Sequence, residues 1–228
     1  MGEMVEFPSN GGQVGGYLAT PEPGAGPGVI VIQEWWGLVD HIKEVCDRLA
    51  AEGFSALAPD LYHGETTKEP DEAGRLMMAM NLDQAARDLT GAVDFLQVHP
   101  TVRGHGVGVV GFCLGGGLAL WLATLDPEGV RAVAPFYGVV PPDVAQPDYS
   151  SIGAAVQGHY AEHDDFAPPE SARKLEAHLQ ELGKIAHFHV YPGTRHAFFN
   201  DSRPDSYDDH AARMAWVRLL EHFREHLG

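Results

Sequence analysis

Apolar runs and amphipathic stretches alternate along the chain and predict strands and helices in turn. Residues 28–33 form a continuous apolar run, which is typical of a strand buried on both faces. Further strands are predicted at 54–57, 107–112, 130–137, 154–157 and 186–191. Apolar residues at helical spacing predict helices over 39–52, 82–98, 114–125, 170–182 and 205–226. Strands that alternate with helices imply an α/β fold, with a mostly parallel central sheet and helices on both faces.

The remaining segments add an edge and a polar loop to this picture. Residues 14–19, flanked by glycines, predict an edge strand or hairpin, and 21–27 form a Pro/Gly loop. Residues 63–80 are polar and then rich in methionine, which predicts a loop and a short helix. Because no internal repeat and no long linker interrupts the pattern, we expect residues 1–228 to form a single domain.

The turn after the 107–112 strand carries the strongest chemical signal. Residues 111–117 read Gly-Phe-Cys-Leu-Gly-Gly-Gly and lead into the predicted 114–125 helix. A strand, a Gly-x-nucleophile-x-Gly turn and a helix make the arrangement called a nucleophile elbow. The glycines give room where larger side chains would collide with backbone, and the helix N-terminus favours a thiolate. We therefore predict Cys113 as the nucleophile.

Two later loops carry the groups that a cysteine nucleophile needs. Asp164 follows the 154–157 strand and His196 follows the 186–191 strand. In a parallel sheet, reacting groups gather at the carboxyl ends of the strands. The chain order nucleophile, acid, histidine is the order expected of α/β-hydrolases. His196 would accept the thiol proton and Asp164 would orient the imidazole, although Asp165 and Glu162 lie close enough to compete for that role.

Backbone donors for a developing oxyanion are predicted beside Cys113. The N–H of Leu114, the residue after the nucleophile, would be one donor, and a second should come from the loop near Trp35.

Composition limits which binding partners and which cellular compartment we expect. The chain has 32 acidic and 15 basic residues among 228, a formal net charge of -17, so nucleic acid and anionic membrane are not expected as partners. It shows no signal peptide pattern and no apolar run long enough to span a bilayer. Its two cysteines make no disulfide framework, and Cys46 lies on the apolar stripe of a predicted helix, which favours core packing. A cytoplasmic location fits a free, reacting thiol.

Two motifs that suggest cofactors have simpler explanations. Residues 106–111 match G-x-G-x-x-G, but the glycines lie before and within a strand instead of opening a helix. His159 and His163 have metal-like spacing, yet that segment is better explained by Asp164. His187 and His189 alternate along a strand and offer two ligands at most. We expect no cofactor and no metal.

Taken together, five segments resemble the dienelactone hydrolase family, α/β-hydrolases that use cysteine as the nucleophile. They read Gln-Glu-Trp-Trp-Gly-Leu (33–38), Ala-Pro-Asp-Leu-Tyr (58–62), Gly-Phe-Cys-Leu-Gly-Gly (111–116), Asp-Asp-Phe-Ala-Pro (164–168) and His-Ala-Phe-Phe-Asn (196–200). The resemblance implies a triad of Cys113, His196 and Asp164, and a carboxylate, Glu34, that helps to activate the thiol. It also implies that the N–H of Trp35 is the second oxyanion donor.

The chain departs from the family where substrate binds. Family members hold a substrate carboxylate with arginines, one soon after the catalytic histidine. Here 197–200 contain no arginine, the next one is Arg203, and Arg75 is the only candidate for the other. An apolar, aromatic pocket is predicted instead, which favours a neutral ester or lactone. Its expected lining is Trp35, Trp36, Phe198 and Phe199, with Met77, Met78 and Met80 as further candidates.

The sequence therefore predicts a hydrolase that cleaves esters or lactones, dienelactone-type substrates included, through a thioester acyl-enzyme. We expect a small-molecule substrate and a monomer or weak homo-oligomer. One alternative is a general carboxylesterase or thioesterase that acts on small neutral esters. Another is a binding protein that keeps the hydrolase fold without catalysis.

Overall fold

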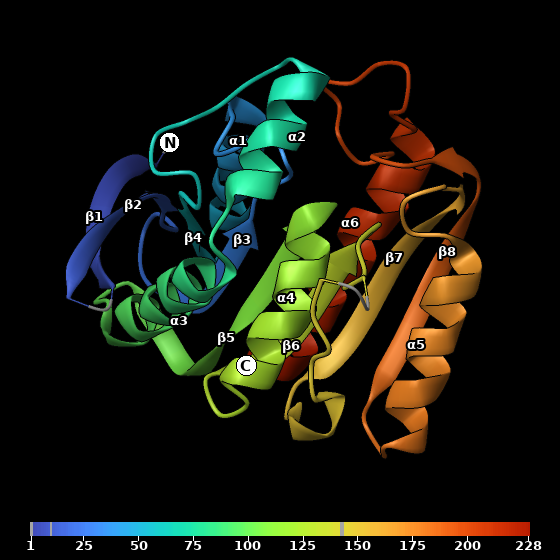
Figure 1. The fold of residues 1–228 in the computed structure, drawn as a ribbon. Coiled ribbons are helices and arrows are strands. Elements are labelled where there is room, and N and C mark those ends of the chain that lie inside the picture. Colours follow the sequence, from blue (N-terminus) through green and yellow to red (C-terminus); the bar gives the residue numbers. More distant parts are fainter. Residues whose placement is uncertain (1, 10, 142–143) are drawn as a thin grey trace.

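The computed structural model describes residues 2–9, 11–141 and 144–228 and places eight strands in one sheet (Figure 1). The strands are β1 Glu3–Ser9, β2 Gly12–Ala19, β3 Gly26–Ile32, β4 Ser55–Pro59, β5 Val102–Phe112, β6 Val130–Phe136, β7 Ala155–His163 and β8 Ala186–Arg195. The helices are α1 Asp40–Ala51, α2 Pro70–Ala79, α3 Leu82–Val98, α4 Leu114–Leu125, η1 Tyr149–Ser151, α5 Pro169–Glu181 and α6 Asp209–Leu227.

The sheet has the strand order β1-β2-β4-β3-β5-β6-β7-β8. The β1–β2 and β2–β4 pairs are antiparallel, and every later pair is parallel. The predicted mostly parallel sheet is confirmed. Because β3, β5, β6, β7 and β8 run in one direction, the loops that follow them open at one end of the sheet.

Helices cover both faces of the sheet and enclose two apolar cores. One core contains the buried side of α1, with Cys46 fully buried, and the buried side of α6. The other lies under α3, α4 and α5, which stand in front of the sheet in Figure 1. The central strands are buried on both sides, as the apolar run at 28–33 predicts. No helix in the described ranges combines the length and apolarity needed to cross a bilayer.

Several element boundaries differ from the sequence prediction. Strand β1 was not predicted, because only Phe7 and Ser9 of its seven residues are buried and the apolar signal is correspondingly short. Strands β7 and β8 continue past their apolar stretches into polar residues. Helix α6 begins at Asp209 instead of 205, because Asp208 accepts the N–H of Ala211 and caps the helix.

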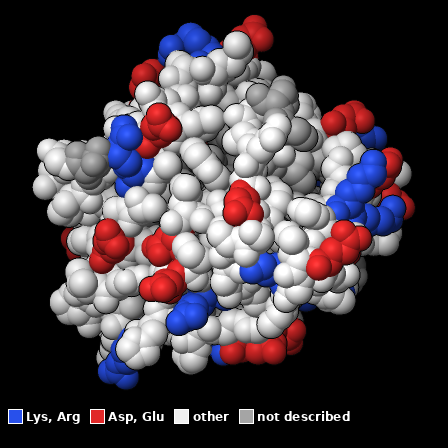
Figure 2. All heavy atoms as spheres, turned by 60° about the horizontal axis from the view of Figure 1, so that its bottom comes forward, with Lys and Arg blue, Asp and Glu red and all other residues white. Residues whose placement is uncertain are grey.

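At the end of the sheet opposite these loops, basic and acidic side chains are intermixed. Figure 2 shows the face at the bottom of Figure 1, where lysines and arginines lie beside acidic residues within a largely uncharged surface. That face therefore presents no continuous basic patch of the kind that binds a phosphate backbone.

Candidate active site

Cys113 lies in a strained turn between β5 and α4. Its backbone has φ 56° and ψ -117°, a conformation that residues other than glycine rarely adopt. Its N–H donates to the carbonyl of Phe136 and its carbonyl accepts from Gly116, both at 3.0 Å. A Cβ on Gly111 would lie 1.9 Å from the carbonyl oxygen of Gly115. The turn therefore needs glycine on both sides, for the steric reason expected from the sequence.

Three of the four non-glycine residues with positive φ in the described ranges lie around this turn. They are Cys113, Tyr137 and Ala197, and all three line the cavity beside the cysteine. Backbone strain persists only where the surrounding structure holds it, and it concentrates at functional sites.

His196 and Asp164 meet at the ends of two neighbouring strands. Asp164 follows β7, His196 follows β8, and the imidazole Nδ1 lies 2.8 Å from Asp164 Oδ2. The other carboxylate oxygen accepts the N–H groups of Phe166 and Ala167, each at 2.9 Å. Burial acts to raise the pKa of Asp164, but these hydrogen bonds outweigh it, and the pKa falls below its usual range.

The competing acids point elsewhere. Glu162 and Asp165 are both exposed, and Glu162 accepts the N–H of Gly193 at 2.8 Å. Of the three neighbouring carboxylates, Asp164 is the one bonded to His196.

The imidazole of His196 connects the acid to the thiol. Burial lowers its pKa, whereas hydrogen bonds to Asp164 and to Cys113 raise it, and the net result is a pKa of about 10. The cationic form of His196 is therefore stable at neutral pH beside the thiol. An imidazolium in that position favours a thiolate, because it supplies an adjacent positive charge.

Glu34 is a buried carboxylate at the end of β3, with neutral donors around it. The side-chain amide of Asn200 donates to Oε2 at 2.7 Å, and the hydroxyl of Tyr137 lies 3.4 Å from Oε1. Asn200 is itself fixed, because its oxygen accepts both the N–H and the hydroxyl of Ser202. Beside this carboxylate, burial raises the pKa of Tyr137 well above its usual value, so the phenol stays a donor.

A cavity of about 480 Å³ lies against Cys113, Glu34 and His196. Trp35 and Leu114 line it, and in the described part of the chain neither backbone N–H has a hydrogen-bond acceptor. The rest of the lining is largely apolar and includes Met77, Leu82, Leu118, Trp121, Val139 and Val144. The cavity thus joins a polar reacting end to an apolar body.

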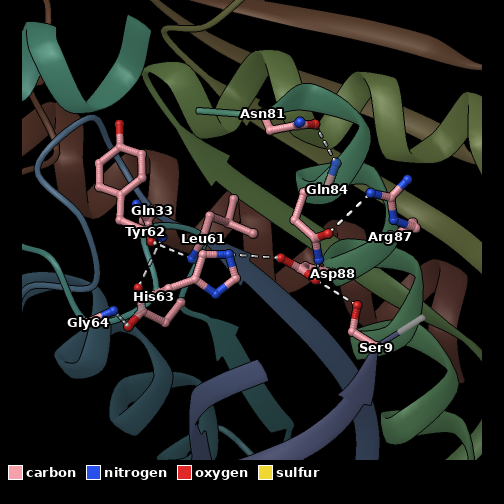
Figure 3. A network of polar contacts seen from close by, with 11 residues as sticks. Ser9, Gln33, Leu61, Tyr62, His63, Gly64, Asn81, Gln84, Arg87 and Asp88 are labelled. Atoms are coloured by element: carbon pink, nitrogen blue, oxygen red, sulfur yellow. Dashed lines mark hydrogen bonds and ion pairs between the residues drawn. The ribbon is translucent and has the colours of Figure 1, made fainter. Parts of the chain in front are cut away.

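A polar network joins the start of α3 to β1 and to the loop after β4 (Figure 3). Asp88 of α3 is fully buried and accepts hydrogen bonds from Ser9 of β1 and from Gln84, both at 2.6 Å. The imidazole of His63, from the loop after β4, lies 3.4 Å from its other oxygen. These contacts fix the first turns of α3, where Leu82 lines the cavity.

The predicted substrate-binding residues are only partly brought to the cavity. Trp36 lines it, with the guanidinium of Arg203 4.8 Å above its ring. Phe198 and Phe199 do not line it: they are 0% and 1% exposed and pack inward. The structure does not bring Arg75 to the cavity: it lies on the exposed side of α2, where Glu72 and Glu65 bind its guanidinium, and its substrate contact stays a prediction.

Of the three methionines predicted as further lining residues, the structure brings one to the cavity. Met77 lines the cavity, Met78 is 85% exposed, and Met80 packs against the core under α3.

Sequence reasoning missed Asn200 and Tyr137 as partners of Glu34, because 166 and 103 positions separate the pairs. Asn200 does close the segment 196–200 that carries the family resemblance, and that was the available signal.

Comparison with known proteins places the whole chain in one group. Residues 14–227 match the model of the dienelactone hydrolase family. Over the full length of both chains, 41% of residues are identical to "Protein usf" of Aquifex pyrophilus and 40% to the "Putative carboxymethylenebutenolidase" of Aquifex aeolicus. The crystal structure of the "Putative Dienelactone Hydrolase" from Klebsiella pneumoniae has a TM-score of 0.89 at 28% identity, covering 99% of each chain. The chain belongs to the dienelactone hydrolase family, α/β-hydrolases that act on ester bonds.

Proposed function

We propose that the enzyme hydrolyses carboxylic esters and lactones through a triad of Cys113, His196 and Asp164. The observation that carries the proposal is the unbroken contact from the buried carboxylate through His196 to the thiol. The three groups take the roles of acid, base and nucleophile.

Acylation begins from the ion pair in which the proton of the Cys113 thiol is held at Nε2 of His196, since Nδ1 is bonded to Asp164. The sulfur attacks the substrate carbonyl carbon, and the carbonyl oxygen becomes an oxyanion. The N–H groups of Leu114 and Trp35 donate to that oxyanion. When the tetrahedral adduct collapses, the C–O bond breaks, His196 returns its proton to the leaving alcohol or enol, and a thioester remains.

Deacylation uses the same groups. His196 takes a proton from water, the resulting hydroxide attacks the thioester carbonyl, and the carbon–sulfur bond breaks. This releases the acid and leaves the Cys113 thiolate beside protonated His196, the pair that begins the next cycle. Glu34, which lines the same cavity, interacts with the thiol and helps to activate it when substrate enters. Asn200 and Tyr137 hold that carboxylate in place.

Dienelactone-type substrates are the first candidate class, because the chain belongs to the dienelactone hydrolase family. A general carboxylesterase or thioesterase activity on neutral esters is the second candidate, and two observations favour it. The cavity body is apolar, and Arg75, the expected anion binder, is paired with Glu72 and Glu65. Because thiolate leaves more readily than an amine, activated and enol esters suit this mechanism better than amides.

Turnover of dienelactone, neutral lactones and p-nitrophenyl acetate by wild type and Cys113→Ala tests the proposal. We expect the variant to lose at least about 10³-fold in kcat/KM while it unfolds at the wild-type urea concentration. Brief incubation of wild type with ester should add the acyl mass to the peptide that contains Cys113. Cys46→Ala is the matched control and should keep its turnover, because Cys46 lies on the buried side of α1, in the core. Undiminished hydrolysis by Cys113→Ala would refute the assignment.

The mechanism requires a reduced thiol, so a cytoplasmic enzyme is part of the proposal. All three triad residues come from one chain, so the site works in a monomer or weak homo-oligomer.

A further inference from the structure

The cavity extends away from Cys113 along one face of α4. Leu114, Gly117, Leu118 and Trp121 all line it, and their spacing of three and four places them on a single stripe of the helix. A rise of 1.5 Å per residue carries this stripe about 10 Å from Leu114 to Trp121. The cavity floor is therefore long and begins at the nucleophile.

Apolar side chains from other elements form the walls over this floor. Met77 of α2 and Leu82 of α3 lie on the cavity lining, as do Val139 and Val144 from the segment after β6. Gly117 lets that segment approach the helix, because a Cβ there would lie 2.8 Å from the carbonyl oxygen of Val139. A larger residue at this position would therefore push the wall away from α4.

The charged groups of the lining lie at the end of the cavity that contains Cys113, away from Trp121. Of the lining residues that the structure describes, Glu34, Cys113, Tyr137, His196 and Arg203 carry or can carry charge, and Cys113 and Tyr137 lie beside Glu34 and His196. Glu34 and His196 lie at the reacting centre, and Arg203 stacks on Trp36 beside Trp35. A carboxylate or ammonium over Leu118, which is 5% exposed, would lose its hydration without a charged partner, which is strongly unfavourable.

The His196 side of the cavity is exposed, whereas the floor beside it is not. Phe166, 76% exposed, and Arg203, also exposed, lie on the His196 side, whereas Leu118 in the floor is 5% exposed. The exposed side suits the entry of water and the exit of the alcohol. The acyl group is bonded to Cys113 Sγ throughout the intermediate, so a chain on it starts where the floor starts.

We propose that the preferred substrates are esters of uncharged, medium-chain acyl groups, which lie along α4 with Trp121 closing the far end. This inference rests on the proposed function. An extended chain advances about 1.2 Å per bond, as the span of an extended residue implies, so a 10 Å floor accepts roughly eight carbons. Each methylene removed from water should raise kcat/KM about three- to fourfold until the floor is filled.

A series of p-nitrophenyl esters from acetate to dodecanoate tests the length of the cavity floor. In wild type, kcat/KM should rise from acetate to octanoate and fall at dodecanoate. In Trp121→Ala the ratio of dodecanoate to octanoate turnover should increase at least about tenfold. Trp216→Ala is the matched control: Trp216 is also a half-buried helical tryptophan but lies on α6, outside the lining, and should keep the wild-type profile.

Two further measurements make the outcome decisive. The mono-p-nitrophenyl ester of octanedioic acid has the length of octanoate with a terminal carboxylate, and it should react at least about tenfold more slowly than octanoate. Trp121→Leu, a milder truncation, should shift the profile in the same direction if Trp121→Ala does not fold. Chain-length preference in the alcohol instead of the acyl group, or identical profiles for wild type and both Trp121 variants, would overturn the inference. If wild type hydrolyses no ester, or Cys113→Ala matches it, the proposed function fails instead.

Discussion

Gly115 offers a test of how tightly the nucleophile turn is held. A Cβ on Gly115 would lie 2.5 Å from each of two backbone oxygens, those of Ile32 and Gln33, where β3 ends. Real Cβ atoms essentially never approach closer than 3.0 Å, so Gly115→Ala requires a shift of at least 0.5 Å (3.0 minus 2.5) between α4 and β3. Overpacking against rigid backbone costs about 3 kcal/mol at the upper end. Alanine recovers about 1 kcal/mol of helix propensity, which leaves a net loss of about 2 kcal/mol.

Gly74→Ala is the matched control for this substitution. Gly74 lies within α2, and a Cβ there would meet nothing within 4 Å. The same chemical change should therefore stabilise the protein by about 0.5–1 kcal/mol. Urea unfolding measures both effects, as opposite shifts of the midpoint at constant slope. Gly115→Ala should also lose about tenfold or more in kcat/KM, because the shift displaces Cys113. A Gly115→Ala protein as stable as wild type, with Gly74→Ala stabilised as expected, would refute the reasoning.

Three further predictions concern the thiols, the buried carboxylate and the acid response. Iodoacetamide should label Cys113 well before Cys46, whose pKa is raised by complete burial; peptide mapping that finds Cys46 labelled first would contradict this. Asn200→Leu removes the shortest donor to Glu34 and should lower kcat/KM about 10- to 100-fold; unchanged turnover would count against its positioning role. Burial and the neighbouring His226 lower the pKa of His222 to about 4, so the unfolded chain takes up the proton first as pH falls. Urea unfolding at several pH values should show stability lost below about pH 6.5, by up to about 1.4 kcal/mol per pH unit, and less steeply in His222→Gln.

The sequence was most informative where one physical constraint dominates. The run 28–33 is typical of a strand buried on both faces, and β3 is that strand. Parallel strands bring their carboxyl ends together, so the ends of β5, β7 and β8 place Cys113, Asp164 and His196 near one another, as predicted. Steric demand likewise explains why glycine stands at 111 and 115.

The sequence was least informative where a side chain can turn either way. Phe198 and Phe199 follow His196 in a turn, and apolar residues there can face a cavity or the core; both face the core, where Phe199 stacks on Phe112. The sequence could not show whether Arg75 points toward the cavity or toward solvent. In the structure it points toward solvent and pairs with Glu72 on the exposed side of α2. The wall formed by Met77 and Leu82 depends on how α2 and α3 pack, which no local pattern encodes.

The hydrogen bond from Ser9 to Asp88 ties the outermost strand, β1, to helix α3. β1 has a neighbour on one side only, yet its last residue is fastened to a fully buried carboxylate of α3. If β1 separates from the sheet, Asp88 loses a donor inside the protein, so fraying of this edge costs more than its backbone hydrogen bonds alone. Slow amide hydrogen exchange should therefore reach the outer edge of the sheet. Removal of the first strand would loosen the helix that carries Leu82, and substrate preference would change before the chemistry at Cys113 does.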